Sequence, residues 1–135
     1  MEAKTLNNLT TLTGRSMLAA IFIVAGSGKI AGYAGTQAYM ESVGVPGLFL
    51  PAVIALEIVG GLAIMLGYQT RVAATLLAGF TLAAALIFHS DFSQQMQSIL
   101  FMKNMAIAGA FLLLLSHGPG RWAIDPRRKI SGARS

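Results

Sequence analysis

Glu57 is the residue whose type and position most clearly suggest chemistry in this 135-residue chain. It lies within an apolar run, residues 48–66, that is close to the roughly 20 residues that cross a bilayer as a helix. A carboxylate at that depth must meet a cation, a polar group or water, or stay protonated, because hydrocarbon does not solvate charge. Two interpretations stay open: a group that handles protons at a functional site, and a structural polar contact between helices.

Other polar side chains occur in or beside the remaining apolar runs, and we predict that they form one intramembrane polar site with Glu57. These side chains are Lys29, Lys103, Asn104, His89, Arg15 and Arg71. At about 1.5 Å of rise per residue, Glu57 lies about 13 Å below the start of its run. Lys29 and Lys103 lie toward the membrane face at which the run 48–66 begins. The aliphatic part of either side chain can bend toward Glu57 or extend outward to the interface.

The composition indicates an integral membrane protein. Hydrophobic residues make up 55% of the chain and charged residues only 11%, against about 25% charged in soluble domains. A soluble fold of this composition would expose large apolar patches. The net charge of +5 comes largely from basic residues that follow the last apolar run. That position favours membrane topology and anionic headgroups over nucleic acid, so we expect no nucleic-acid partner.

Four apolar runs predict four transmembrane helices, at about residues 16–33, 48–66, 72–89 and 99–117. The very short connection between the second and third makes these two helices antiparallel neighbours. We therefore predict an all-α integral membrane protein, a four-helix bundle of up-down-up-down topology. A polar cytoplasmic segment, residues 1–14, precedes the transmembrane domain, residues 15–120, and a basic cytoplasmic tail, residues 121–135, follows it.

The distribution of basic residues predicts that both termini are cytoplasmic. Lys4, Arg15 and Arg71 fall on the same side of the membrane as the basic tail, and the positive-inside rule places that side in the cytoplasm. The basic residues of the tail are Arg121, Arg127, Arg128, Lys129 and Arg134. We expect them to contact anionic lipid headgroups.

Small residues within the spans predict close contacts between helices. Gly28 and Gly32 form a Gly-xxx-Gly pair, and Gly60 and Gly61 lie one turn after Glu57. Packing is the main interpretation of these glycines, and a ligand groove is the alternative.

Several kinds of site are excluded or made improbable by the residues present. The chain has no cysteine, which excludes disulfides and thiolate-bound metals. His89 and His117 fall at opposite membrane faces, so they cannot hold one haem together. The segment from Gly26 to Lys29 lacks the upstream glycine and the following Ser or Thr of a phosphate-binding loop. We expect no metal, and no cofactor held by this chain alone.

A series of short motifs runs in order through residues 15–126 and resembles the DoxX family of small bacterial inner-membrane proteins. The motifs are Arg15 with Phe22, Gly26 and Lys29; Tyr39-Met40; Gly44-Val45-Pro46; Glu57 with Gly60-Gly61; Leu66-Gly67; Thr70-Arg71; Lys103-Asn104; and Gly118-Pro119-Gly120 with Asp125. Each motif is weak alone, and the order and spacing carry the resemblance. The chain has Ala123 where the family often has Ser, so no hydroxyl role is assigned there.

The resemblance implies a multi-pass protein of the bacterial inner membrane. Some relatives are linked to quinone-dependent thiosulfate oxidation and others to membrane redox complexes. We therefore expect an accessory membrane subunit of a respiratory or redox complex rather than a stand-alone enzyme, with a quinone as its ligand. Lys103 or His89 would donate to the headgroup, and Glu57 would handle a proton. The partner would be a membrane redox protein or a second copy of the chain.

Two other functions stay open at this point. One is a non-catalytic scaffold, in which the polar residues only specify how the helices pack. The other is a small proton-coupled permease, which would have to form homo-oligomers because four spans are few for one transporter.

Overall fold

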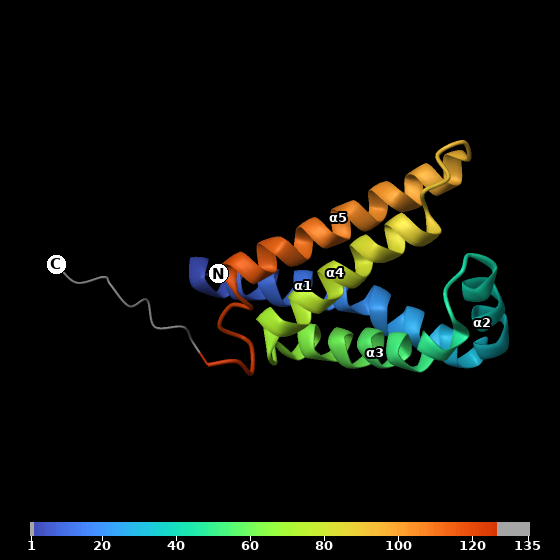
Figure 1. Ribbon diagram of the computed structural model, residues 1–135. Coiled ribbons are helices and arrows are strands. Elements are labelled where there is room, and N and C mark those ends of the chain that lie inside the picture. Colours follow the sequence, from blue (N-terminus) through green and yellow to red (C-terminus); the bar gives the residue numbers. More distant parts are fainter. Residues whose placement is uncertain (1, 127–135) are drawn as a thin grey trace.

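A computed structural model describes residues 2–126, and every regular element in that part of the chain is helical (Figure 1). The helices are α1 (Ala3–Ala31), α2 (Tyr33–Ser42), the 3₁₀ turn η1 (Gly47–Phe49), α3 (Leu50–Leu66), α4 (Thr70–Phe88) and α5 (Gln95–His117). Four of these segments are long and apolar enough to cross a membrane: α1, η1 with α3, α4, and α5. The predicted all-α fold with four spans is confirmed, and the cytoplasmic placement of both termini stays a prediction.

The long helices form two antiparallel pairs, α1 with α3 and α4 with α5, and the pairs are joined by packing of α3 on α4. Figure 1 shows the pairs close together at the end that carries the N-terminus and the C-terminal end of α5. They diverge toward the end that carries α2. We call these two ends the terminal end and the α2 end.

Two segments that were expected to lie outside the spans are helical. The polar N-terminal segment continues into the first span, since α1 begins at Ala3. Asn and Thr are only slightly weaker helix formers than apolar residues, and the chain after α5 packs on this segment where Gly120 approaches Thr11. The first connection likewise contains the ten-residue helix α2. Residues 127–135 lie outside the described residues, and so do the headgroup contacts predicted for Arg127, Arg128, Lys129 and Arg134.

The closest approach between α1 and α3 depends on two glycines. A Cβ atom at Gly26 would lie 2.6 Å from Ile58 Cγ1, and one at Gly61 would lie 2.8 Å from Ile23 Cγ1. The Cβ at Gly61 would also lie 3.2 Å from the carbonyl oxygen of Ala19, which cannot rotate away as a side chain can. Any side chain at either position would therefore push these two helices apart.

The glycine pattern in the sequence predicted this interface only in part. Packing at Gly60 and Gly61 is confirmed, because a Cβ at Gly60 would lie 3.2 Å from Leu77 of α4. The Gly28–Gly32 pair makes no such contact: nothing lies within 4 Å of a Cβ at Gly28. Gly26, two residues earlier, takes that role because it lies on the opposite face of the helix, toward α3.

A core of small and aromatic residues joins the two helix pairs. Phe22 of α1 and Phe111 of α5 are buried, and their ring centroids lie 5.4 Å apart, so the first and last helices meet at this level. The other buried members of this cluster are Ala19, Ile64, Ala73, Ala74, Leu77 and Ala78. Many large apolar side chains outside the core are exposed, as expected for surfaces that face lipid.

We expect Gly61→Val to destabilise the protein by about 1–3 kcal/mol, because the added side chain overpacks the α1–α3 interface. The measurement is the unfolding midpoint in mixed detergent–SDS micelles. Gly79→Val is the control, since nothing lies within 4 Å of a Cβ at Gly79. Equal losses of stability in the two variants would show that the glycines of this protein do not set the distance between α1 and α3.

Candidate functional site

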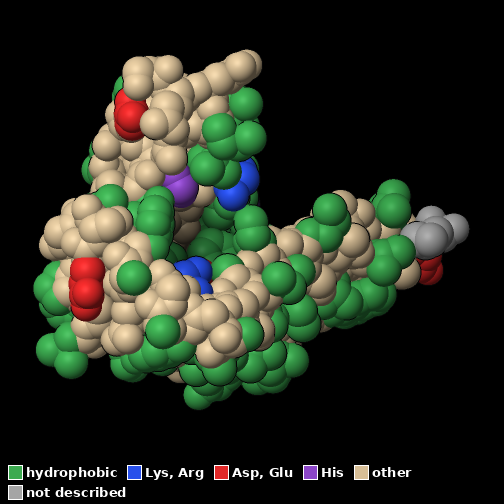
Figure 2. All heavy atoms as spheres, turned by 90° about the vertical axis from the view of Figure 1, so that its right-hand side faces the viewer, with side chains coloured by type: hydrophobic (Ala, Val, Ile, Leu, Met, Phe, Trp, Pro, Cys, Tyr) green, Lys and Arg blue, Asp and Glu red, His purple; other side chains and the backbone are tan. Residues whose placement is uncertain are grey.

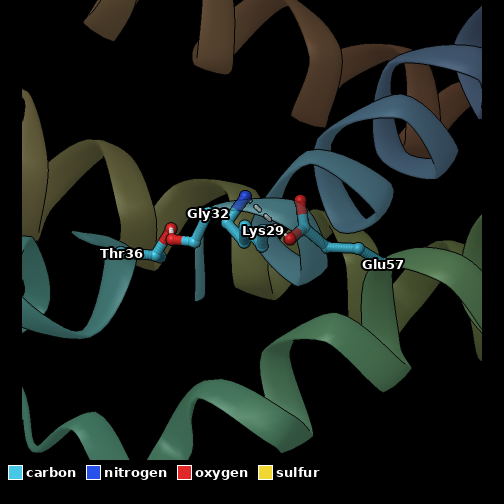
Figure 3. A network of polar contacts seen from close by, with 4 residues as sticks. All are labelled: Lys29, Gly32, Thr36 and Glu57. Atoms are coloured by element: carbon cyan, nitrogen blue, oxygen red, sulfur yellow. Dashed lines mark hydrogen bonds and ion pairs between the residues drawn. The ribbon is translucent and has the colours of Figure 1, made fainter. Parts of the chain in front are cut away.

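Glu57 of α3 forms an ion pair with Lys29 of α1 (Figure 3). Lys29 Nζ lies 2.9 Å from Glu57 Oε1, and the two side chains are 29% and 4% exposed. Gly26, one turn before Lys29, allows this contact, because a Cβ there would lie 3.3 Å from Glu57 Cβ. The bare backbone at Gly26 therefore brings the carboxylate within reach of the lysine.

The pair leaves hydrogen-bonding capacity on the carboxylate. Within residues 2–126, no group other than Lys29 lies within hydrogen-bond distance of the Glu57 carboxylate. Glu57 can thus accept a further hydrogen bond or a proton from a ligand beside it. Separately, the nearby turn from α1 into α2 is held by Thr36, whose hydroxyl donates to the Gly32 carbonyl at 2.9 Å (Figure 3).

A cavity of about 460 Å³ opens where the two helix pairs diverge. Figure 2 shows it as a hollow at the α2 end, with Lys, His and hydrophobic side chains beside it. Five of the seven predicted site residues line it, namely Glu57, Lys29, Lys103, Asn104 and His89. Its aromatic wall consists of Phe22, Tyr39, Phe49, Phe80 and Phe88.

The polar groups on the α4–α5 side of the cavity are held in different ways. The Asn104 amide donates to the Thr81 carbonyl at 3.3 Å, and His89 Nδ1 lies 3.1 Å from Gln97 Oε1. Lys103 has no carboxylate partner among residues 2–126. Of the two lysines considered from the sequence, Lys29 therefore binds Glu57, while the Lys103 ammonium stays available to a ligand.

The other two predicted site residues, Arg15 and Arg71, lie at the terminal end instead. Arg15 of α1 is 3% exposed, and its Nη2 donates to the carbonyl of Trp122. Arg71 lies in the first turn of α4 and lines a separate polar pocket. The seven residues are thus divided between two ends of the molecule.

Residues 122–125 form a clasp over the turn between α3 and α4. Ile124 N donates to the Leu66 carbonyl at 3.1 Å, and Asp125 N donates to the Gly67 carbonyl at 2.8 Å. The Asp125 carboxylate accepts hydrogen bonds from the backbone of Gln69 at 2.6 Å and of Thr70 at 2.8 Å. A carboxylate from a distant segment therefore caps the N-terminus of α4.

The backbone at Gly67 makes room for the clasp. Its φ of 68° is left-handed, and a Cβ there would overlap the Arg15 guanidinium and Ala123. Glycine is the residue that meets both demands at low cost.

The clasp also sets the ionisation of its carboxylate. Partial burial raises the pKa of Asp125, but hydrogen bonds from Thr70 and Gln69 and the nearby Arg15 charge outweigh it. The net result is a pKa below the ordinary value, so the carboxylate is charged at neutral pH.

Sequence reasoning missed this clasp. Gly118-Pro119-Gly120 and Asp125 belong to the motifs of the family resemblance. A hydrogen bond to a backbone carbonyl, such as that of Trp122, cannot be recognised from residue types. The signal available was a lone Asp four residues after a basic residue at the end of a span.

No set of three His, Asp or Glu side chains gathers as metal ligands within the described part of the chain.

The family profile described as DoxX matches residues 10–90. The chain belongs to the DoxX family. It is 53% identical to inner membrane protein YqjF of Escherichia coli K12 over 122 residues, which cover 90% of this chain and 94% of that protein. It is 40% identical to inner membrane protein YphA of the same organism, covering 86% and 88% of the two chains.

A more distant relative has a name that refers to redox chemistry. "Putative oxidoreductase CatD" of Bacillus subtilis 168 is 35% identical over 57% of each chain. No solved structure matches. With its four spans and its named inner-membrane relatives, this DoxX-family protein is a multi-pass protein of the inner membrane.

We expect Lys29→Met to cost about 1–3 kcal/mol of stability, between the values for exposed and fully buried ion pairs, because it leaves Glu57 without its cation. Adding Glu57→Gln should recover part of that loss, since the double variant buries no unpaired charge. Unfolding midpoints of both variants in detergent measure the coupling. Strictly additive losses would mean that the two side chains do not interact.

We expect Asp125→Ala to cost about 0.5–2 kcal/mol, the value of a lost helix cap. Because the folded-state pKa is depressed, this stabilisation is present above the unfolded-state value of about 3.9 and disappears as the pH falls through the folded-state pKa. The difference in unfolding free energy between the variant and the parent protein should be the same at pH 7 and pH 5, and smaller at pH 3. Asp91→Ala is the control, because among residues 2–126 the Asp91 side chain bonds only within its own loop, to Ser93 and Gln94.

Proposed function

We propose that this DoxX-family protein binds a quinone headgroup in the cavity at the α2 end, as an accessory membrane subunit of a respiratory or redox complex. The observation that supports this proposal is the combination of an aromatic cavity with an unpaired lysine and a buried carboxylate on its lining.

The size and lining of the cavity suit such a ligand. Its volume of about 460 Å³ falls in the range of small-molecule sites, which are mainly apolar with a few convergent polar groups. Tyr39 and Phe88 stack with centroids 5.5 Å apart on its wall. Flat aromatic side chains of this kind suit a planar ring.

The polar groups are placed for hydrogen bonding and proton transfer. Lys103 would donate to a quinone carbonyl oxygen, and Glu57 would exchange a proton with a carbonyl oxygen of the quinone. Reduction of a quinone to a quinol takes two electrons and two protons. In this proposal a partner redox protein supplies the two electrons and water supplies the two protons, one of them through Glu57, while this chain binds the ring. The name of the relative CatD agrees with a redox setting.

A scaffold is the second candidate function. The observation that favours it is the position of the Lys29–Glu57 pair beside Gly26, at the closest contact between α1 and α3. There the pair could serve only to fix one helix against the other.

The test of the quinone site is calorimetric titration of decylubiquinone into the protein embedded in nanodiscs. We expect Lys103→Gln to weaken binding about tenfold, the effect of losing one charge-assisted hydrogen bond. Arg71→Gln removes the same charge at the terminal end, and its binding should match the parent protein. Absence of binding by the parent protein, with only lower stability in Glu57→Gln, would favour the scaffold.

The role as a redox subunit has its own test. Deleting the gene should change quinone-dependent respiration of membrane vesicles, and the Lys103→Gln variant should fail to restore the parent rate. Normal respiration in the deletion strain would contradict the redox role even if a quinone binds.

A further inference from the structure

The terminal end carries a second, polar pocket that the proposed function does not use. Its volume is about 790 Å³, and cations reach it from three separate segments: Lys4 of α1, Arg71 of α4 and Arg121 after α5. Among residues 2–126, none of these three side chains forms an ion pair. Asp125 is the one carboxylate that residues 2–126 place on its lining, and it is bound to the N-terminus of α4. The pocket therefore has an excess of positive charge.

A groove of about 560 Å³ adjoins the pocket between α1 and α5. The two share Asn7, His117, Gly118 and Gly120 on their linings. Arg15 lines the groove, and although it is 97% buried, its Nε and Nη1 have no hydrogen-bond partner within the described residues. Its guanidinium lies under the clasp against Gly67, so an anion in the pocket would stabilise its charge without hydrogen-bonding to it.

Apart from Thr11 and Gly14, the rest of the groove is apolar. It is lined by Leu18 of α1 and by Ala110, Leu113 and Leu114 of α5. Leu113 is 63% exposed, so this wall is open on the side that the bundle presents to lipid. The terminal end thus combines a cationic pocket with an apolar channel that leads into the spans.

We propose that this composite site binds the phosphate group of an anionic phospholipid. Arg71 and Arg121 hold the phosphate, because guanidinium groups match phosphate oxygens in a bidentate geometry. One acyl chain lies in the groove against Leu113 and Leu114. A free phosphate ion would satisfy the cations equally well, but it would leave the apolar groove unused.

The bound lipid would join parts of the chain that meet only at this end. Arg71 lies in the first turn of α4, which Asp125 caps, and Arg121 directly precedes the clasp. A phosphate between the two arginines would hold the clasp against the bundle. The site lies at the opposite end from the quinone cavity, so either proposal can fail alone.

The experiment is native mass spectrometry of the full-length protein in detergent, with phosphatidylglycerol, phosphatidylcholine of the same acyl chains, or inorganic phosphate added. We expect phosphatidylglycerol to bind about tenfold more tightly than phosphatidylcholine. The double variant Arg71→Gln/Arg121→Gln should lose this preference, and the charge-matched Lys103→Gln, at the other end, should keep it.

Further arms separate a lipid site from an ion site. Leu113→Ala, which removes apolar surface from the groove without placing a polar group in the span, should weaken retention of phosphatidylglycerol. Equal retention of the two lipids would overturn the proposal, as would an equal loss of preference in Lys103→Gln. Inorganic phosphate that raises the melting temperature as much as phosphatidylglycerol would show a free-anion site and also overturn it.

Discussion

A carboxylate in the middle of a membrane span needs a partner, and the contact between α1 and α3 provides a cation. Lys29 reaches Glu57 because Gly26 removes the side chain that would hold the two helices apart. Gly61 maintains the same spacing farther along the interface. The pair and the close packing therefore depend on each other: the glycines bring the charges together, and the charges favour that one arrangement of the two helices.

The rest of the bundle follows from this tight pair. α4 and α5 form a second pair that meets the first at the terminal end and diverges at the α2 end. The divergence opens the cavity beside Glu57, while the convergence allows residues 122–125 to close over the α3–α4 turn. The α2 end thus holds a mainly apolar cavity with charged side chains on its lining, and at the terminal end a hydrogen-bonded clasp lies beside a polar pocket.

The fold could be predicted from hydropathy because a bilayer admits few structures. Runs of about 20 apolar residues must be helices in order to satisfy their own backbones, and the four spans were found on that basis. The helical N-terminal segment and α2 were missed, because both lie where polar side chains suggest a loop and tertiary contacts decide the outcome. The candidate site was predicted in part: Lys29, Glu57 and Lys103 do line one cavity, but Arg15 and Arg71 do not.

The sequence by itself determined that this chain spans the membrane, which segments do so, and that Glu57 would need a partner there. These conclusions follow from transfer free energies, which depend on residue type and length alone. Only the tertiary structure decided which lysine pairs with Glu57 and that Asp125 caps a helix 55 residues away along the chain. Such contacts depend on helix rotation and on backbone positions between distant segments, and neither is encoded in the local pattern of residues.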